Sequence, residues 1–195
     1  MYLVGITGAS GSAIGVSLIE KLIELGIKTG VIVSNTGYKT MEYELNTTSI
    51  LEIIRGRLPH ADLSLLTEFS IDNFFCSPAT GNSNWESLII APCSMNTLSA
   101  IACGCSDNLI KRAAAVALKE NRKLILIPRE SPLSLIHLKN MLAVKEAGAD
   151  IVLPVPEFYS FPEGVNDVVN STVNRVLQLV KLSAKDGNYW MDNNS

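Results

Sequence analysis

Two adjacent charged residues, Arg129 and Glu130, follow a run of apolar residues (123–128) that reads as a buried strand. A charge buried without a partner costs several kcal/mol, which is comparable with the whole stability margin of a domain. The pair therefore either reaches solvent at the strand end or points into a ligand crevice, because open parallel sheets bind ligands at the carboxyl ends of their strands. In such a crevice Arg129 could bind a phosphate or carbonyl group, and Glu130 could act as a general acid or base if a dry environment raised its pKa.

A second candidate site is the small-residue stretch TGASGS (7–12), between the first predicted strand and the first predicted helix. Small residues let the backbone approach a ligand, and the start of a helix offers free N–H groups to an anion. The spacing matches neither the dinucleotide fingerprint nor the P-loop. A phosphate site, with the Ser10 hydroxyl as an extra donor, and an ordinary tight turn are both consistent with these residues.

A third candidate site is the stretch PCSMNT (92–97), where another apolar strand leads into a helix. Ser94 could serve only as the N-cap of that helix. Alternatively, the two hydroxyl-rich strand ends form opposite walls of one crevice that binds a phosphate and a ring. No positioned His accompanies Cys93, so we interpret it as a small buried apolar residue rather than a nucleophile.

Three further polar residues follow later in the chain. Tyr159 comes after the last predicted strand and could hydrogen-bond a phosphate, and Arg175 lies among apolar residues of the last predicted helix. Either could instead be a surface residue, because their spacing does not establish a pair. His137 lies in an apolar helical stretch, and we interpret it as a half-buried histidine with a satisfied hydrogen bond rather than as a catalyst.

The composition narrows the class of protein. The 195 residues, 47% of them hydrophobic, predict a single domain with a sizeable core. A net charge of -3 without a long basic run argues against a nucleic-acid partner. We expect no membrane span and no signal peptide, because apolar runs are short and no charged leader precedes one. The four cysteines lack zinc-site spacing, so we expect no metal and a reducing, cytoplasmic compartment.

Strand-like apolar runs alternate with helical patterns along the chain. The expected strands are 2–7, 27–34, 63–69, 87–91, 123–128 and 149–154. The expected helices are 12–25, 36–44, 49–55, 95–102, 107–121, 133–147 and 165–183. This alternation implies parallel strands joined by crossover helices. We predict an α/β fold with a three-layer, doubly wound parallel sheet of the Rossmann or flavodoxin-like type, with residues 1–183 as a single domain and 184–195 as a C-terminal tail.

Taken together, residues 4–179 resemble the UbiX-like flavin prenyltransferases. The matching motifs are TGASG (7–11), PCS (92–94), TLS (97–99), NLI (108–110), RAA (112–114), LKE (118–120), PRE (128–130), IHL (136–138) and FY (158–159). Each motif alone is a weak signal, and their common order along the chain carries the resemblance.

The resemblance implies a flavodoxin-like fold, a homo-oligomer that is usually a dodecamer, and FMN as the cofactor. It further implies a metal-independent transfer of a dimethylallyl group from dimethylallyl phosphate to N5 and C6 of reduced FMN. The product, prenylated FMN, would serve a UbiD-like decarboxylase, and the family's older description as aromatic-acid decarboxylases reflects that partnership.

The resemblance also assigns roles to individual residues. Those implied to bind FMN are Gly8, Ala9, Ser10, Ser34, Ser94, Met95, Asn96, Thr97 and Arg129. Those implied to bind the prenyl phosphate or line its pocket are Glu44 from a neighbouring subunit, Phe74, Lys119, Tyr159 and Arg175. The implied catalytic residues are Ser10, Lys119 and Glu130, and Glu130 resembles the family's acid/base residue.

Two other functions remain open from the sequence. One is FMN-dependent decarboxylation of a peptidyl cysteine by a related flavoprotein of the same fold. Those relatives depend on an active-site His and a Pro-Ala-Ser-Ala-Asn-type loop, whereas the comparable loop here is PATGN (78–82) with no convincing His beside it. The other is a non-catalytic flavin carrier, although the presence of Lys119, Glu130, Tyr159 and Arg175 together favours catalysis.

Overall fold

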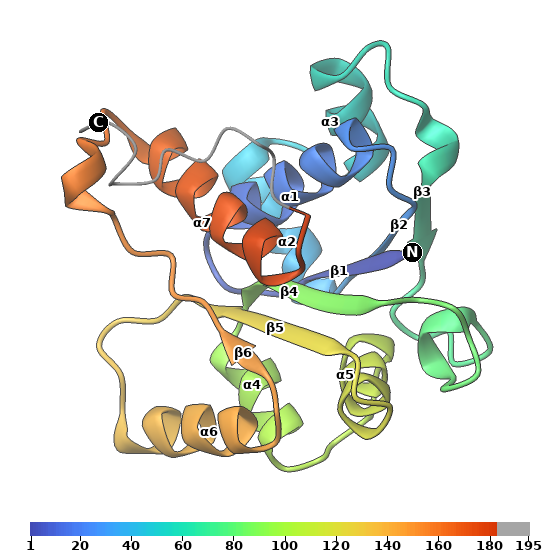
Figure 1. Cartoon of the computed structure of the whole chain (residues 1–195), viewed down its shortest axis with the longest axis vertical. Coiled ribbons are helices and arrows are strands. Elements are labelled where there is room, and N and C mark those ends of the chain that lie inside the picture. The colour runs from blue at the N-terminus through green and yellow to red at the C-terminus, as the bar shows by residue number, and fades with distance from the viewer. Residues whose placement is uncertain (183–195) are drawn as a thin grey trace.

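A six-stranded parallel sheet forms the middle layer of the protein (Figure 1). The computed structural model describes residues 1–182, so the predicted tail (184–195) lies outside the described residues. The strands lie in the order β3-β2-β1-β4-β5-β6 and every neighbouring pair is parallel. This order is that of the Rossmann type, and the predicted doubly wound parallel sheet is confirmed.

Each strand is followed by at least one helix or helical turn, as the sequence pattern predicts. The strands are β1 (Tyr2–Ile6), β2 (Thr29–Val33), β3 (Leu66–Phe69), β4 (Ser87–Cys93), β5 (Lys123–Pro128) and β6 (Asp150–Ile151). The α-helices are α1 (Ser12–Glu24), α2 (Asn35–Leu45), α3 (Ile50–Arg57), α4 (Met95–Ala102), α5 (Leu109–Lys119), α6 (Leu135–Glu146) and α7 (Val165–Leu179). The 3-10 helices are η1 (Leu63–Leu65), η2 (Ser77–Ala79) and η3 (Phe158–Ser160).

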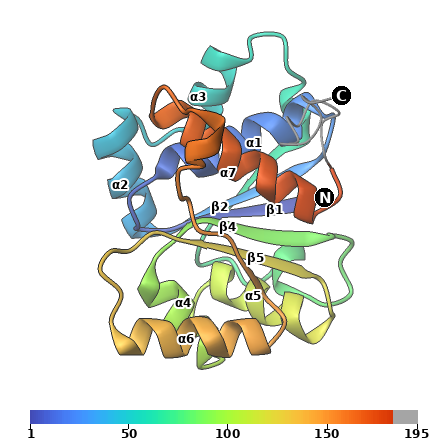
Figure 2. The same cartoon turned by 60° about the vertical axis from the view of Figure 1, so that its left-hand side comes forward.

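Helices cover both faces of the sheet, with α1, α2, α3 and α7 on one side and α4, α5 and α6 on the other (Figure 2). Side chains of each strand therefore alternate between two apolar cores. On β5, for example, Ile125 and Ile127 pack into the core beneath α1 and α7, and Leu124 and Leu126 into the core beneath α4 and α5. Burial on both faces explains why the strands are almost continuously apolar in sequence.

The last strand is shorter than predicted, because β6 covers residues 150 and 151 of the expected 149–154. The Val152 N–H donates one further ladder bond to the carbonyl oxygen of Leu126, at 2.9 Å. Pro154 and Pro156 follow, and neither has an N–H group with which to extend the ladder. The chain therefore leaves the sheet here and runs toward η3 and α7.

The site lies where the winding of the sheet reverses, between β1 and β4. The chain leaves these neighbouring strands in opposite directions, which opens a crevice at their carboxyl ends. The first helix approaches β4 very closely there, at Gly15. A Cβ atom added at Gly15 would lie 2.2 Å from the carbonyl oxygen of Ala91. Glycine is therefore needed for α1 to pack against the strand end.

We predict that Gly15→Ala lowers the free energy of unfolding by about 1–3 kcal/mol, because the opposing atom belongs to the backbone and cannot rotate away. Urea denaturation measures this change. The matched control is Gly56→Ala within α3, where an added Cβ meets nothing within 4 Å. The control should be neutral or stabilise by up to about 1 kcal/mol through helix propensity. Equal stabilities for the two variants would contradict the close approach at Gly15.

Candidate active site at the carboxyl edge of the sheet

One buried side chain, Thr7, joins the loops that follow β1 and β4. Its Oγ1 donates a hydrogen bond to the carbonyl oxygen of Pro92 at 2.8 Å and accepts one from the N–H of Ser94 at 2.7 Å. Thr7 is 1% exposed, so these bonds form away from water and are correspondingly strong. They hold together the two stretches (7–12 and 92–97) that the sequence suggests as opposite walls of a crevice.

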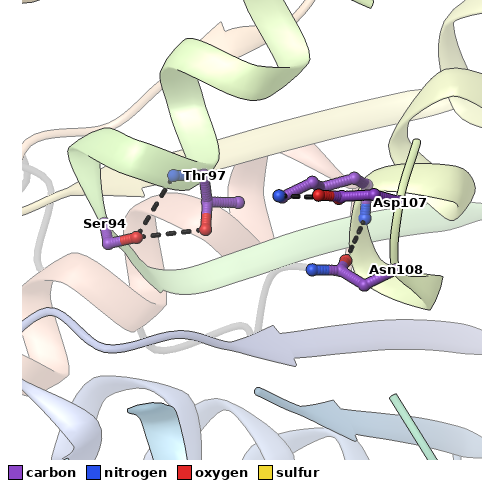
Figure 3. A network of polar contacts seen from close by, with 5 residues as sticks. Ser94, Thr97, Asp107 and Asn108 are labelled. Carbon is purple, nitrogen blue, oxygen red and sulfur yellow. Dashed lines mark hydrogen bonds and ion pairs between the residues drawn. The ribbon is translucent and has the colours of Figure 1, made fainter. Parts of the chain in front are cut away.

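Serine hydroxyls position two helix starts at this edge. Ser94 Oγ accepts from the N–H of Thr97 at 3.2 Å and donates to Thr97 Oγ1 at 3.0 Å, as Figure 3 shows. Ser34 Oγ accepts from the N–H of Gly37 at 3.0 Å and lies 3.2 Å from Thr36 Oγ1. Each serine is therefore an N-cap, of α4 and of α2 respectively.

The start of α5 is capped in the same way (Figure 3). Asn108 Oδ1 accepts from the N–H of Lys111 at 3.0 Å, and Asp107 Oδ1 lies 2.7 Å from Lys111 Nζ. The Leu109 N–H donates to the carbonyl oxygen of Ile71, just beyond β3, at 2.8 Å. The start of α5 is thus tied to the loop after β3, and α5 runs from there to the amino end of β5.

The start of α1 carries an anion from its own chain, the Glu44 carboxylate. Glu44 Oε1 and Oε2 accept from the N–H of Gly11 at 3.0 and 3.1 Å, and Oε2 accepts from the N–H of Ser12 at 2.8 Å. Helix α2 brings Glu44 there because it stands across the strand ends (Figure 2). Partial burial alone would raise the pKa of Glu44, but hydrogen bonds from the Ser10 hydroxyl and from the Ser12 and Gly11 N–H groups outweigh burial and lower it. Glu44, expected at a neighbouring subunit's site, thus contacts its own chain's small-residue turn.

Arg129 reaches from the end of β5 to the turn after β1. Its Nε donates to the carbonyl oxygen of Ser10 at 3.3 Å, across the end of the intervening strand β4. Both residues are exposed. Glu130 is also exposed, and its Oε1 accepts from the N–H of Ser131 at 3.1 Å. The charged pair therefore reaches solvent at the strand end, and Arg129 does so directly over the small-residue turn.

The remaining residues expected to bind FMN also lie at these strand ends. Gly8 and Asn96 are exposed, whereas Ala9 and Met95 are buried. Gly8 lies so close to Thr36 that a Cβ atom added there would be 2.6 Å from the threonine side chain. The turn after β1 and the start of α2 are therefore in contact.

Tyr159 and Arg175 form a separate group beyond the end of β6. Tyr159 is exposed in η3, and Arg175 is exposed on α7 with its Nη1 donating to Gln178 Oε1 at 3.2 Å. Loss of hydration, together with a hydrogen bond and the charge from Glu157, raises the pKa of the Tyr159 phenol, and the positive charge of Arg175 opposes this rise. The phenol therefore stays protonated as a hydrogen-bond donor near neutral pH.

Lys119 is not at this edge within the chain. It is the last residue of α5, which ends beside the amino end of β5, and its Nζ pairs with Glu120 Oε1 at 2.7 Å (Figure 1). Arg129 follows the opposite end of β5, and a six-residue strand spans about 20 Å. Phe74, in the loop after β3, is 39% exposed. Within a single chain, Lys119 therefore lies far from the group around Arg129.

Sequence reasoning included Thr7 in the small-residue stretch without giving it a role, and it missed Thr36 altogether. A threonine at the end of a buried strand signals a buried hydroxyl that needs a partner, although its partner is 85 residues away. Cys93 is fully buried, and burial raises the pKa of its thiol far above the ordinary value, which fits the predicted apolar role.

The donor set fits a phosphorylated ring compound such as FMN. Exposed hydroxyl and backbone groups at Gly8, Ser10 and Thr36, with the half-buried Ser34 hydroxyl, suit a phosphate and a polyol chain, and the Arg129 guanidinium suits a carbonyl-bearing ring. Within residues 1–182, no group of three or more His, Cys, Asp or Glu side chains gathers as a metal site. None of the helices in that range is both long and apolar enough to cross a membrane.

Comparison with known proteins identifies relatives along nearly the whole chain. Residues 1–182 match the family model described as Flavoprotein. The chain is 44% identical over 183 residues to the flavin prenyltransferase UbiX of Chlamydia muridarum, covering 94% of this chain and 93% of the relative. It is 39% identical over 189 residues to the mitochondrial flavin prenyltransferase of Saccharomyces cerevisiae, covering 96% and 74%.

Solved structures agree with this relationship. A dodecameric FMN-dependent UbiX-like decarboxylase from Escherichia coli O157:H7 superposes with a TM-score of 0.86 at 37% identity, covering 97% of this chain and 98% of that one. AnUbiX, in complex with FMN and dimethylallyl pyrophosphate, also has a TM-score of 0.86, at 36% identity, covering 97% and 96%. The FMN-dependent cysteine decarboxylase TvaF has a TM-score of 0.57 at 16% identity, covering 88% and 96%, and shares the fold alone.

We predict that Glu44→Gln lowers the free energy of unfolding at pH 7, because it removes the charge from three backbone hydrogen bonds. The folded-state pKa of Glu44 lies below its ordinary 4.5, so its carboxylate stabilises fully above about pH 4.5. The difference between wild type and variant should then shrink as the pH falls through the folded-state pKa. Urea denaturation between pH 7 and pH 4 measures it.

The control is Glu42→Gln, which removes an exposed carboxylate from the same helix and should change stability by less than about 0.5 kcal/mol. A Glu44→Gln variant as stable as wild type at pH 7 would show that Glu44 does not hold the start of α1 in solution.

Proposed function

The chain belongs to the UbiX-like flavin prenyltransferase family, and from this premise we propose that it transfers a dimethylallyl group from dimethylallyl phosphate to N5 and C6 of reduced FMN. The observation that carries the proposal is the similarity to named flavin prenyltransferases along nearly the whole chain, at 44% identity for the Chlamydia muridarum enzyme. Support comes from AnUbiX, whose structure contains FMN and dimethylallyl pyrophosphate. The product would be prenylated FMN, used by a UbiD-like decarboxylase.

In this proposal the carboxyl edge of the sheet binds FMN. The residues proposed to hold it are Gly8, Ala9, Ser10, Ser34, Ser94, Met95, Asn96, Thr97 and Arg129. The Glu44 carboxylate already occupies the start of α1, and a second anion there would be repelled. The flavin phosphate therefore fits better at the start of α2, beside Ser34 and Thr36.

The residue types also suit departure of an allylic phosphate. The bond between the allylic carbon and the phosphate oxygen breaks, and its electron pair leaves with the phosphate. We assign Lys119, Tyr159 and Arg175 to stabilise that anion, because donors aimed at developing charge lower the barrier. Reduced FMN would supply one electron pair from N5 and one from C6 for the two new bonds, so no protein nucleophile is required. The bond to C6 also uses the alkene of the prenyl group, which takes up a proton as C6 releases one. Glu130 accepts the proton released from flavin N5 and returns a proton to the departing phosphate, as a general base and acid.

The position of Lys119 makes oligomerisation part of the proposal. Within one chain the length of β5 separates Lys119 from Arg129 and Glu130. We therefore propose that Lys119 completes the site of a neighbouring subunit in a homo-oligomer, and the dodecameric Escherichia coli relative gives the expected form. Phe74 would line the prenyl pocket and Ser10 would assist catalysis. Glu44, which binds the start of α1 in its own chain, would lie near the prenyl phosphate in a neighbouring subunit's site.

We further treat residues 1–183 as one flavin-binding domain and place the protein in the cytoplasm. The four cysteines Cys76, Cys93, Cys103 and Cys105 are free thiols, which suits a reducing compartment. No specific observation favours peptidyl-cysteine decarboxylation, since TvaF, the cysteine decarboxylase compared above, shares the fold alone. A pure carrier would not need the charged residues assigned to phosphate departure and proton transfer.

We predict that anaerobic incubation of the protein with reduced FMN and dimethylallyl phosphate yields a flavin heavier by one prenyl unit. Mass spectrometry of the extracted flavin detects the product. Unchanged FMN after incubation with folded, FMN-loaded protein would overturn the proposed reaction.

Glu130→Gln provides the matched variant for that assay, because it keeps size and hydrogen bonding but cannot exchange a proton near neutral pH. It should bind FMN normally and form the adduct at least about 100-fold more slowly, the usual scale for losing a general acid–base group. Loss of FMN binding instead would assign Glu130 to binding rather than to proton transfer.

Shared sites can be tested by mixing two inactive chains. Lys119→Ala and Glu130→Gln oligomers should each be nearly inactive alone. After dissociation and joint reassembly, about a quarter of the sites should combine an intact Lys119 with an intact Glu130 if different subunits supply them. The prenylation activity recovered in the mixture, relative to wild type, measures the fraction of such sites. No recovery, under conditions where tagged wild-type subunits exchange, would place Lys119 and Glu130 in the same chain's site or Lys119 outside the site.

A further inference from the structure

The segment between β5 and α6 carries Glu130 and is anchored at both of its ends. At its start, Arg129 Nε donates to the carbonyl oxygen of Ser10 at 3.3 Å. At its end, Ser134 and His137 form two reciprocal hydrogen bonds at the start of α6. Only the four residues 130–133 lie between these anchors, so the placement of Glu130 depends on both of them.

The second anchor is a capping box in which histidine replaces the usual acidic or amide residue. Ser134 Oγ accepts from the N–H of His137 at 3.2 Å, and His137 Nδ1 accepts from the N–H of Ser134 at 3.3 Å. Capping boxes ordinarily use Glu or Gln at the third helical position. The imidazole performs the same task only when Nδ1 is unprotonated, with the ring proton on Nε2.

We propose that His137 is a positioning residue for the reaction, because its neutral imidazole closes the capping box and thereby holds Glu130 at the edge of the sheet. The inference rests on the proposed function for the role of Glu130, whereas the contacts that define the capping box do not depend on that role. His137 is half-buried and its Nδ1 is engaged with backbone, so it acts through the segment rather than on the substrate.

The position of α6 makes this cap more important than most. The residues that follow the cap, Leu135, Ile136 and Leu138, are 66%, 69% and 49% exposed. Packing within the chain therefore contributes little to fixing the first turn of α6, and the reciprocal hydrogen bonds take a larger share of that task. Loss of the cap should loosen the turn and the four-residue segment before it.

The experiment compares His137→Ala, which removes the acceptor, with His137→Gln, whose side-chain carbonyl oxygen can accept from the Ser134 N–H. Removing a cap shifts a local equilibrium by about fivefold, so we expect His137→Ala to lower kcat for prenyl transfer by up to about that factor. KM for FMN should change by less than about twofold, because all the proposed FMN contacts except Arg129 lie on other turns and Arg129 keeps its own anchor to Ser10. His137→Gln should restore kcat to within about twofold of wild type.

Hydrogen exchange provides a readout that does not require activity. Mass spectrometry of peptides covering residues 129–138 should show faster exchange in His137→Ala and wild-type exchange in His137→Gln. If the wild type forms no prenylated flavin, the proposed function fails while this comparison still tests the anchor. Unaltered exchange in His137→Ala would overturn the positioning role.

Two further variants separate positioning from general destabilisation. Ser134→Ala removes the other half of the box and should reproduce the kcat loss, which keeps the test available if His137→Ala does not fold. Ser49→Ala removes the N-cap of α3, where Ser49 Oγ accepts from the N–H of Glu52 at 3.2 Å, and should lower stability without lowering kcat. A His137→Gln variant as slow as His137→Ala, despite normal exchange, would show that the imidazole acts chemically and would contradict the proposal.

Discussion

The buried hydroxyl of Thr7 is the interaction on which the rest of the site depends. From the end of β1, Thr7 Oγ1 both donates to the carbonyl oxygen of Pro92 and accepts from the N–H of Ser94, at the point where the winding of the sheet reverses. Without it, the Ser94 N–H would lose its acceptor, which costs more than the bond itself contributes, whereas the Pro92 carbonyl oxygen would still accept from the Thr7 N–H at 3.2 Å. One side chain therefore helps to fix the distance between the turn after β1 and the start of α4. The relative positions of the residues on those two turns depend on that distance.

Charge at the strand ends is arranged around that fixed spacing. The positive end of α1 meets Glu44, so its helix dipole is already compensated within the chain. Arg129 lies over the adjacent turn with its remaining donors directed to solvent. An incoming flavin phosphate therefore encounters one occupied helix start and one available cation. In the proposed binding mode, the start of α2 would therefore take the flavin phosphate and Arg129 would contact the ring.

Much of this arrangement follows from local sequence, and the rest depends on contacts between distant segments. The sequence correctly predicted that Arg129 and the small-residue turn lie at one edge, because both follow strands of a parallel sheet and parallel strands place their carboxyl ends together. The partner of Thr7 and the contact of Glu44 with the start of α1 could not be read from spacing, since each joins elements whose relative placement only the folded sheet defines. The early end of β6 could have been read from Pro154 and Pro156, although the apolar residues that predicted the strand continue beyond residue 151.

The direction of α5 has the widest consequence for function. The helix begins beside the loop after β3 and ends at the amino end of β5, so Lys119 faces away from its own chain's crevice. A catalytic lysine there is useful only if another subunit presents its carboxyl edge to it. Assembly would therefore serve catalysis directly, because it would bring together charges that the fold of one chain keeps apart.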